Sequence, residues 1–173
     1  PIGLCATAGA RLLGATTIIA VDGNDHRLGI AQKMGADVTL NFKNCDVIDE
    51  IMKITGGRGA DSAIEALGTQ ATFESALRCI KPGGTLSSLG VYSEDLKIPL
   101  SAFAAGLGDH KINTALCPGG KERMRRLMNV VASNRLDLGL LVTHQYKLDD
   151  IVAAYDLFAH QRDGVLKVAI TPQ

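Results

Sequence analysis

What the chain lacks excludes several classes of function. Its 18 Lys and Arg residues are balanced by 18 Asp and Glu residues, so it offers no excess positive charge to nucleic acid or to an anionic membrane surface. Its longest apolar runs, such as Leu138 to Val142, are far shorter than the roughly 20 residues that a membrane helix needs. We therefore expect neither nucleic acid nor a membrane as a partner.

The spacings that mark metal sites and hydrolases are also missing. The four cysteines stand singly, without the separation of two to four residues that structural zinc sites need. The four histidines form neither H-x-x-x-H nor H-E-x-x-H, and no serine lies in G-x-S-x-G. We expect no catalytic residue and no metal ligand in this chain, and free thiols of the kind found in the reducing cytoplasm.

What is present is a repeated alternation of short apolar runs and amphipathic segments. Runs rich in β-branched residues, such as Thr17 to Val21, are bounded by Gly, Asp or Asn and separated by segments of helical spacing. This alternation predicts an α/β fold of βαβ units around a parallel sheet. The predicted strands are 17–21, 38–41, 60–67, 85–91, 111–116, 142–146 and 166–170. The predicted helices are 2–13, 25–34, 47–55, 70–80, 121–133 and 149–161.

Asp22 suggests what such a sheet would bind. Dinucleotide-binding folds place an acidic residue at a strand end, about 20 residues after a glycine-rich turn, where it hydrogen-bonds the adenosine ribose. Asp22 follows the strand 17–21 and lies nineteen residues after Gly3. Its carboxylate would also repel the extra phosphate of NADP, which favours NAD. Most isolated acidic residues at strand ends only form turns, so Asp22 alone leaves both interpretations open.

The position of Gly3 has a consequence for the sheet. If Gly3 is the last glycine of a G-x-G-x-x-G turn, then Pro1 and Ile2 are its two intervening residues, and the other glycines would precede Pro1. The first, central strand of the sheet would precede Pro1 too, which leaves unpaired backbone groups on both flanking strands. The chain also opens without a start methionine or a charged leader. We expect a doubly wound Rossmann sheet whose first strand is missing, in a fragment of a longer protein.

Two further glycines follow predicted strands. Gly68 comes after Ile64-Glu65-Ala66-Leu67, and Gly90 stands in Leu89-Gly90-Val91-Tyr92. Each alone is explained by the conformational freedom that turns require. Their occurrence at successive strand ends favours a ligand, because ligands of such sheets lie along the carboxyl ends of the strands.

With these pieces in order, the chain resembles the medium-chain dehydrogenases, most closely the tetrameric bacterial secondary-alcohol dehydrogenases. The resemblance covers nearly the whole length. It rests on Pro1-Ile2-Gly3-Leu4, Gly35-Ala36-Asp37, Lys81-Pro82-Gly83-Gly84, Leu116-Cys117-Pro118-Gly119-Gly120, Asn134-Arg135-Leu136-Asp137 and Leu141-Val142-Thr143-His144.

The resemblance implies which residues contact the cofactor. Those by the pyrophosphate would be Pro1, Ile2 and Gly3, with Lys167 as a basic residue near the phosphates. Those by the adenosine would be Asp22, Gly23, Asn24, Arg27 and Phe42. Those by the nicotinamide and its ribose would be Ala66, Leu67, Gly68, Gly90, Val91 and Tyr92. NADP-using relatives have a small residue and then, two positions on, an arginine where this chain has Asp22 and Asn24, so the departure favours NAD.

The resemblance also implies that cofactor binding and catalysis belong to different domains. Residues 1–118 would form the NAD-binding domain, and 119–173 a return segment that packs toward a catalytic domain absent from this sequence. That domain would carry the zinc ligands and the proton relay for hydride transfer between a small alcohol or ketone and the nicotinamide. The whole protein would be a cytoplasmic homo-oligomer, and this chain alone inactive. A non-catalytic nucleotide-binding module, or a polyol, formaldehyde or quinone-type reductase of the same family, remains an alternative.

Overall fold

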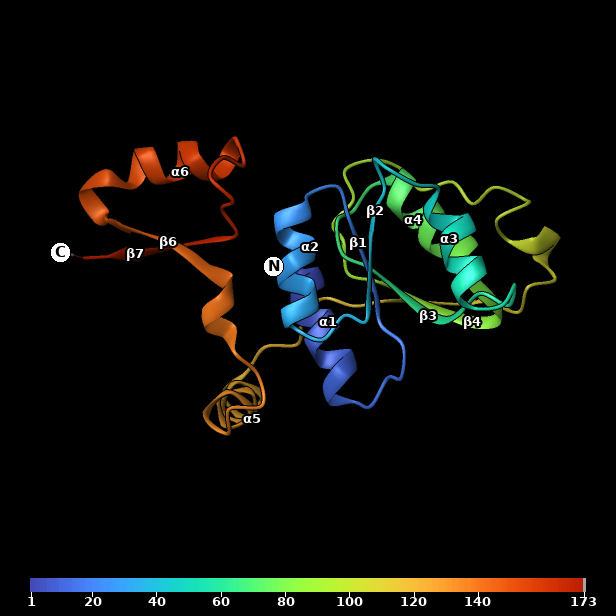
Figure 1. The fold of residues 1–173 in the computed structure, drawn as a ribbon, viewed down its shortest axis with the longest axis horizontal. Helices are drawn as coiled ribbons and strands as arrows, with labels where there is room; N and C mark the ends of the chain where they lie inside the picture. The colour runs from blue at the N-terminus through green and yellow to red at the C-terminus, as the bar shows by residue number, and fades with distance from the viewer. Residues whose placement is uncertain (173) are drawn as a thin grey trace.

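The helices and strands of the computed structural model, which describes residues 1–172, follow one another in the predicted order (Figure 1). The helices are α1 (Ile2–Leu12), α2 (Asp25–Lys33), α3 (Val47–Ile54), α4 (Gln70–Cys79), α5 (Lys121–Ala132) and α6 (Ile151–Ala159). The strands are β1 (Ile19–Asp22), β2 (Val38–Asn41), β3 (Ala60–Glu65), β4 (Ile80–Ser88), β5 (Lys111–Thr114), β6 (Val142–Lys147) and β7 (Lys167–Thr171). Helix α6 is shorter than predicted because a 3₁₀ turn, Leu148–Asp150, precedes it.

The strands pair in parallel throughout, as predicted, and they form three sheets. One sheet has the order β1-β2, the second β3-β4-β5 and the third β6-β7. Helices α1 and α2 contact each other, as do α3 and α4. The first pair lies on one side of the strands β1 to β4 and the second pair on the other (Figure 1). The α/β, doubly wound fold class is therefore confirmed.

Local chemistry explains where several elements begin and end. Helix α2 begins after Asn24, whose side chain accepts hydrogen bonds from the amides of His26 and Arg27. Strand β3 ends at Glu65, two residues earlier than predicted, because the Glu65 carboxylate accepts from the amides of Leu67 and Gly68 and turns the chain. Strand β4 likewise ends at Ser88, which leaves Gly90 and Val91 in the turn that follows.

Two clusters of buried apolar side chains flank the sheets. The first joins α1, α2 and the C-terminal segment, and the second lies under α4 and β4. The first consists of Leu4, Ala8, Ile18, Ile30, Ala31, Met34, Ala36, Leu141 and Leu166. The second consists of Phe73, Leu77, Ile80, Leu86 and Ala102. The first cluster thus holds the C-terminal segment against α1 and α2, and the second holds α4 against β4.

Strands β1 and β3 are edge strands of their sheets. On one side of each, no strand within residues 1–172 pairs with it. Beside β3 lies an open, apolar hollow of about 590 Å³. It is lined by Ala6, Gly9, Ala10, Leu13, Gly14 and Ala15 of α1 and its following turn, with Ile64 and Leu89 from the other side. Side chains that an interior strand would normally bury are open here: Ile64 is 47% exposed and Val21 is 42% exposed.

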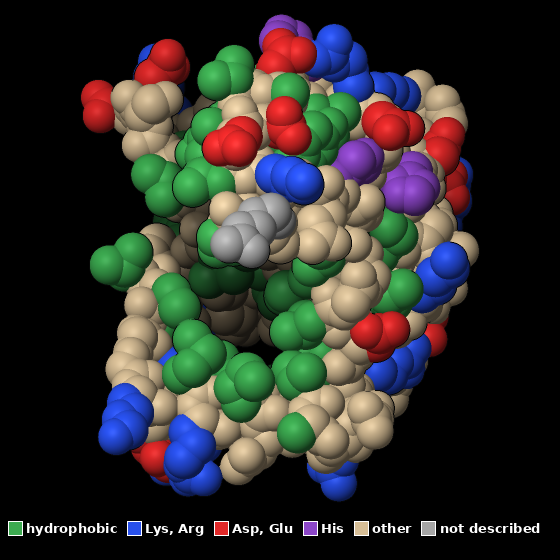
Figure 2. Space-filling view, turned by 90° about the vertical axis from the view of Figure 1, so that its left-hand side faces the viewer, with side chains coloured by type: hydrophobic (Ala, Val, Ile, Leu, Met, Phe, Trp, Pro, Cys, Tyr) green, Lys and Arg blue, Asp and Glu red, His purple; other side chains and the backbone are tan. Residues whose placement is uncertain are grey.

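The C-terminal segment is anchored at two points and open elsewhere. Leu141 and Leu166 enter the first core cluster, and Leu166 is 1% exposed. Helix α5, in contrast, buries none of its side chains. Figure 2 shows hydrophobic side chains gathered around a hollow on the face of the molecule that this segment forms. The large exposed apolar side chains of α5 and α6 are Met124, Leu127, Met128, Val152, Tyr155 and Phe158.

Candidate dinucleotide-binding site

The residues predicted to bind adenosine lie together at the carboxyl end of β1. Asp22 ends the strand, and its carboxylate accepts a hydrogen bond from the Asn24 amide at 2.9 Å. The Arg27 guanidinium lies 3.8 Å from the other carboxylate oxygen. A Cβ on Gly23 would come within 2.5 Å of the Phe42 ring, so that ring, itself 57% exposed, lies directly against the turn. An acidic oxygen, a cation and an open aromatic face are thus presented side by side.

The start of α1 connects this cluster to the next strand end. Asp22, Arg27 and Lys167 all lie near Pro1, at the start of α1. Leu166, which precedes Lys167, packs in the same core cluster as Leu4 of α1, so the start of β7 lies beside α1 although it is distant in sequence. On the other side, a Cβ on Gly3 would lie 3.9 Å from the Cβ of Ala66. The α1 N-terminus, where amide groups favour an anion, lies between the ends of β1 and β3.

The turns after β3 and β4 touch each other through their glycines. Gly68 has a φ of +97°, and a Cβ there would lie 2.4 Å from the Val91 carbonyl oxygen. A Cβ on Gly90 would lie 2.3 Å from the Gly68 amide nitrogen. No residue other than glycine fits either position without a shift of backbone. The side chains of Leu67 and Val91 are 68% and 85% exposed, so apolar surface is open beside this contact.

Beneath these turns lies Glu65, a residue that the sequence analysis did not single out. Its side chain is buried, with 3% exposed, and accepts hydrogen bonds from both turns. Burial by itself raises the pKa of this carboxyl, but the donors Gly68, Tyr92, Leu67 and Thr72 together lower it below its ordinary value. Its position offered a clue, because Glu65 ends β3 just as Asp22 ends β1.

All three groups of predicted residues therefore meet along one edge formed by the ends of β1, β3 and β4. Two further observations indicate that this edge can bind a dinucleotide. The buried Nε of Arg27 has no hydrogen-bond partner among residues 1–172, which leaves a donor for a ligand. The paired glycines remove side chains where the chain of a cofactor would cross the strand ends. Ile2, 56% exposed, lies in the first turn of α1 at the same edge.

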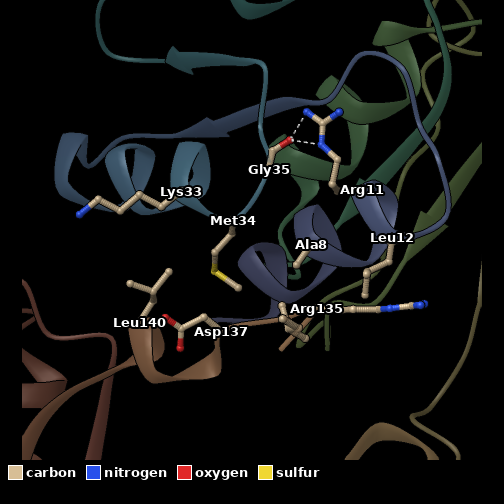
Figure 3. Close-up of a pocket in the computed structure, with 10 residues that line it drawn as sticks. Ala8, Arg11, Leu12, Lys33, Met34, Gly35, Arg135, Asp137 and Leu140 are labelled. Carbon is tan, nitrogen blue, oxygen red and sulfur yellow. Dashed lines mark hydrogen bonds between the residues drawn. The ribbon is translucent and has the colours of Figure 1, made fainter. Parts of the chain in front are cut away.

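A second hollow, of about 190 Å³, lies at the other end of α1 (Figure 3). Arg11 and Met34 line it, together with Arg135 and Asp137 of one of the motifs that carry the resemblance. The Arg11 guanidinium is engaged by the Gly35 carbonyl oxygen, at 2.8 Å from Nη2, and by the Asp37 carboxylate. This hollow contains none of the predicted cofactor residues and is separate from the candidate site.

Residues 1–172 contain no group of three or more His, Cys, Asp or Glu side chains placed to hold a metal ion. In the same range, no helix has the length and apolar character needed to cross a bilayer.

Comparison with known proteins agrees with this geometry. The chain has the architecture of an α/β, doubly wound nucleotide-binding domain, and it superposes on the alcohol dehydrogenase TADH from Thermus sp. ATN1 with a TM-score of 0.89 and 29% identity, over 100% of this chain and 49% of the other. A family model described as zinc-binding dehydrogenase matches residues 1–133. The chain belongs to the zinc-binding dehydrogenase family, as the resemblance implied.

Sequence relatives support the same assignment. The chain is 84% identical over 172 residues to an alcohol dehydrogenase from Cupriavidus necator, covering 99% of this chain and 47% of that protein. It is 35% identical to an NADP-dependent isopropanol dehydrogenase from Thermoanaerobacter brockii, over 98% of this chain and 49% of the relative. The chain thus spans about half the length of the curated relatives it matches.

Proposed function

We propose that this chain is the NAD(H)-binding portion of an alcohol dehydrogenase that transfers hydride between a small alcohol or ketone and nicotinamide. The observation that carries the proposal is the cluster around Asp22, with Arg27 and Phe42, on the same edge as the two touching glycine turns. Opposite charges and an open ring at one end suit adenosine ribose and adenine. Glycine-lined strand ends suit the nicotinamide half.

The preference for NAD over NADP rests on Asp22. A carboxylate at this position accepts hydrogen bonds from ribose hydroxyls and repels a 2′-phosphate. The Asn24 amide and Arg27 hold the carboxylate in place at the strand end. Several relatives that are 33–36% identical are described as NADP-dependent or as probably so, so the proposed preference for NAD rests on Asp22 and not on these relatives.

The chemistry of the whole protein is divided between this chain and a part that relatives carry elsewhere. A zinc ion, when bound in the catalytic part of such enzymes, polarises the alcohol oxygen. The residues of this chain bind and orient the dinucleotide, through Asp22 and Arg27 at one end and the glycine turns at the other. The boundary near residue 118, with 119–173 packing toward a catalytic domain, belongs to the same proposal, supported by the open apolar faces of α5 and α6.

The split sheet supports a further element of the proposal. A strand that runs between β1 and β3 and leads into α1 would pair with both free edges and fill the apolar hollow beside β3. Because α1 starts between the carboxyl ends of β1 and β3, such a strand would run parallel to both. This is the first strand of a Rossmann sheet.

Relatives of other specificity keep the substrate class open to test. The chain is 34% identical to a sorbitol dehydrogenase from Bacillus subtilis over 99% of its length. The 84% identity to an alcohol dehydrogenase favours a simple alcohol over a polyol.

A cytoplasmic location is supported by four free cysteines. A homo-oligomer rests on the family resemblance, and sedimentation of the full-length protein tests it.

Cofactor titration tests the proposed function. In the full-length protein, NADH fluorescence should be enhanced on binding, and NADH should bind at least about tenfold more tightly than NADPH, a difference of ~1.4 kcal/mol. Much tighter binding of NADPH would overturn the role of Asp22. Absence of binding by either nucleotide would overturn the dinucleotide site itself.

A further inference from the structure

Glu65 occupies an unusual position for a carboxylate. It is 3% exposed, it ends β3, and none of the ion pairs within residues 1–172 includes it. A buried charge without a countercharge is costly unless hydrogen bonds satisfy its oxygens. The side chain therefore has to be explained by the donors around it.

Each carboxylate oxygen serves a different turn. Oε1 accepts from the Leu67 amide at 2.7 Å, the Gly68 amide at 2.8 Å and the Thr72 hydroxyl at 2.8 Å, all on the β3 side. Oε2 accepts from the Tyr92 hydroxyl at 2.7 Å on the β4 side, where the Ser88 hydroxyl lies 3.4 Å away. One ionised group thus ties together the two turns whose glycines touch above it.

The network also orients the Tyr92 hydroxyl. The ionised carboxylate can only accept, so Tyr92 donates to it, and the Ser88 hydroxyl, 2.7 Å away, can then donate to the Tyr92 oxygen. The Tyr92 ring is held in addition by an edge contact with Phe73, with ring centroids 6.2 Å apart. Both the chain direction after Gly90 and the orientation of Tyr92 depend on the charge of Glu65.

We propose that Glu65 is a positioning residue for the nicotinamide half of the cofactor: its carboxylate holds the turns 66–68 and 90–92 at the separation and orientation in which they receive that half. The inference rests on the proposed function, because it takes these two turns as the nicotinamide-facing part of a dinucleotide site. Among residues 1–172, the hydrogen bonds to the Glu65 carboxylate come from the β3 and β4 turns and α4, and none comes from Asp22, Arg27 or Phe42. Loss of the Glu65 charge therefore affects one half of the cofactor only.

The test compares two ligands that differ in the nicotinamide. NADH and ADP-ribose, which lacks the nicotinamide ring, are titrated by calorimetry against the full-length protein and its Glu65→Gln variant. The variant keeps the side-chain shape and removes the charge, so NADH should bind about tenfold more weakly. ADP-ribose should bind within about twofold of wild type. Glu74→Gln, which removes a carboxylate paired with Arg78 on the outer part of α4, should alter neither affinity.

The pH dependence separates positioning from simple packing. Because the pKa of Glu65 is lowered, NADH affinity of the wild type should hold through the range where an ordinary Glu protonates and fall at lower pH. The Glu65→Gln variant should lack this fall, and ADP-ribose should not show it in either protein. Ser88→Ala removes the hydroxyl that lies 2.7 Å from the Tyr92 hydroxyl and keeps the Glu65 charge. It should weaken NADH binding in the same selective way by roughly threefold.

Three results would overturn the inference. They are an unchanged NADH affinity in Glu65→Gln, an equal loss of both ligands, and, if that variant does not fold, an unselective or absent effect in Ser88→Ala. Failure of wild-type protein to bind either ligand would instead refute the proposed function, so the two failures are distinguishable.

Discussion

We expect single residues at the strand ends to decide which nicotinamide cofactor the protein binds. The Asp22 carboxylate lies between the Asn24 amide and the Arg27 guanidinium. Replacing Asp22 by Gly and Asn24 by Arg removes the negative charge and supplies a cation for a 2′-phosphate. We expect the double variant to shift the NADH-to-NADPH affinity ratio by at least about 100-fold toward NADPH, a change of ~2.7 kcal/mol. Parallel fluorescence titrations measure it, and an unchanged ratio would contradict the role given to Asp22.

The glycine contact between two turns gives a second prediction for single residues. In Gly90→Ala the new Cβ would lie 2.3 Å from the Gly68 amide nitrogen and 2.5 Å from Glu65 Oε2. We expect a loss of about 1–3 kcal/mol in the free energy of unfolding, as for other overpacked sites, together with weaker NADH binding. Gly29→Ala is the matched control, because a Cβ there meets nothing within 4 Å. In helix α2 that change should stabilise by about 0.5–1 kcal/mol. Denaturant unfolding compares the two, and equal effects would count against the close approach.

At the scale of elements, the C-terminal strand pair is held to the nucleotide-binding core by few side chains. Leu166, 1% exposed, belongs to the core cluster of α1 and α2 and immediately precedes Lys167. Leu166→Ala should cost about 2–5 kcal/mol in the free energy of unfolding, and the displaced Lys167 should weaken cofactor binding. The control Ile54→Ala, at a 39% exposed position at the end of α3, should cost less than about 1 kcal/mol. A stable Leu166→Ala protein would show that the segment is anchored elsewhere.

The order of the helices and strands is the feature of the fold that the sequence predicted best. The helices and strands occur in the predicted order because hydrophobic spacing and turn residues are local properties. Their ends were less predictable. The strand predicted over 60–67 stops at Glu65 because a side-chain carboxylate turns the chain, and the Lys81-Pro82-Gly83-Gly84 segment lies inside β4 as an irregularity in its pairing with β3. The first effect comes from a local side-chain hydrogen bond that hydrophobic spacing does not reveal, and the second depends on the pairing of two strands.

For the molecule as a whole, the split sheet has a measurable consequence. In parallel strands, alternate amides point to opposite edges, so β1 and β3 each leave one set unpaired in residues 1–172. We expect hydrogen exchange at 19–22 and 60–65 to be clearly slower in the full-length protein than in a chain of residues 1–173. Peptides from α4, buried in both, serve as the control. Equal exchange of β1 and β3 in the two chains would contradict the proposed central strand.

The sequence by itself determined the alternation of elements, the parallel sheet and the acidic residue at the end of β1, because each depends on spacing and residue type within about 20 positions. The family resemblance supplied the candidate cofactor residues, and the tertiary structure brought them to one edge. Only the tertiary structure decided that Gly68 and Gly90 touch, that Glu65 joins their turns, and that Leu141 and Leu166 complete the core beside α1. These contacts link residues far apart in sequence, and only the packing and hydrogen bonding of the folded chain select them.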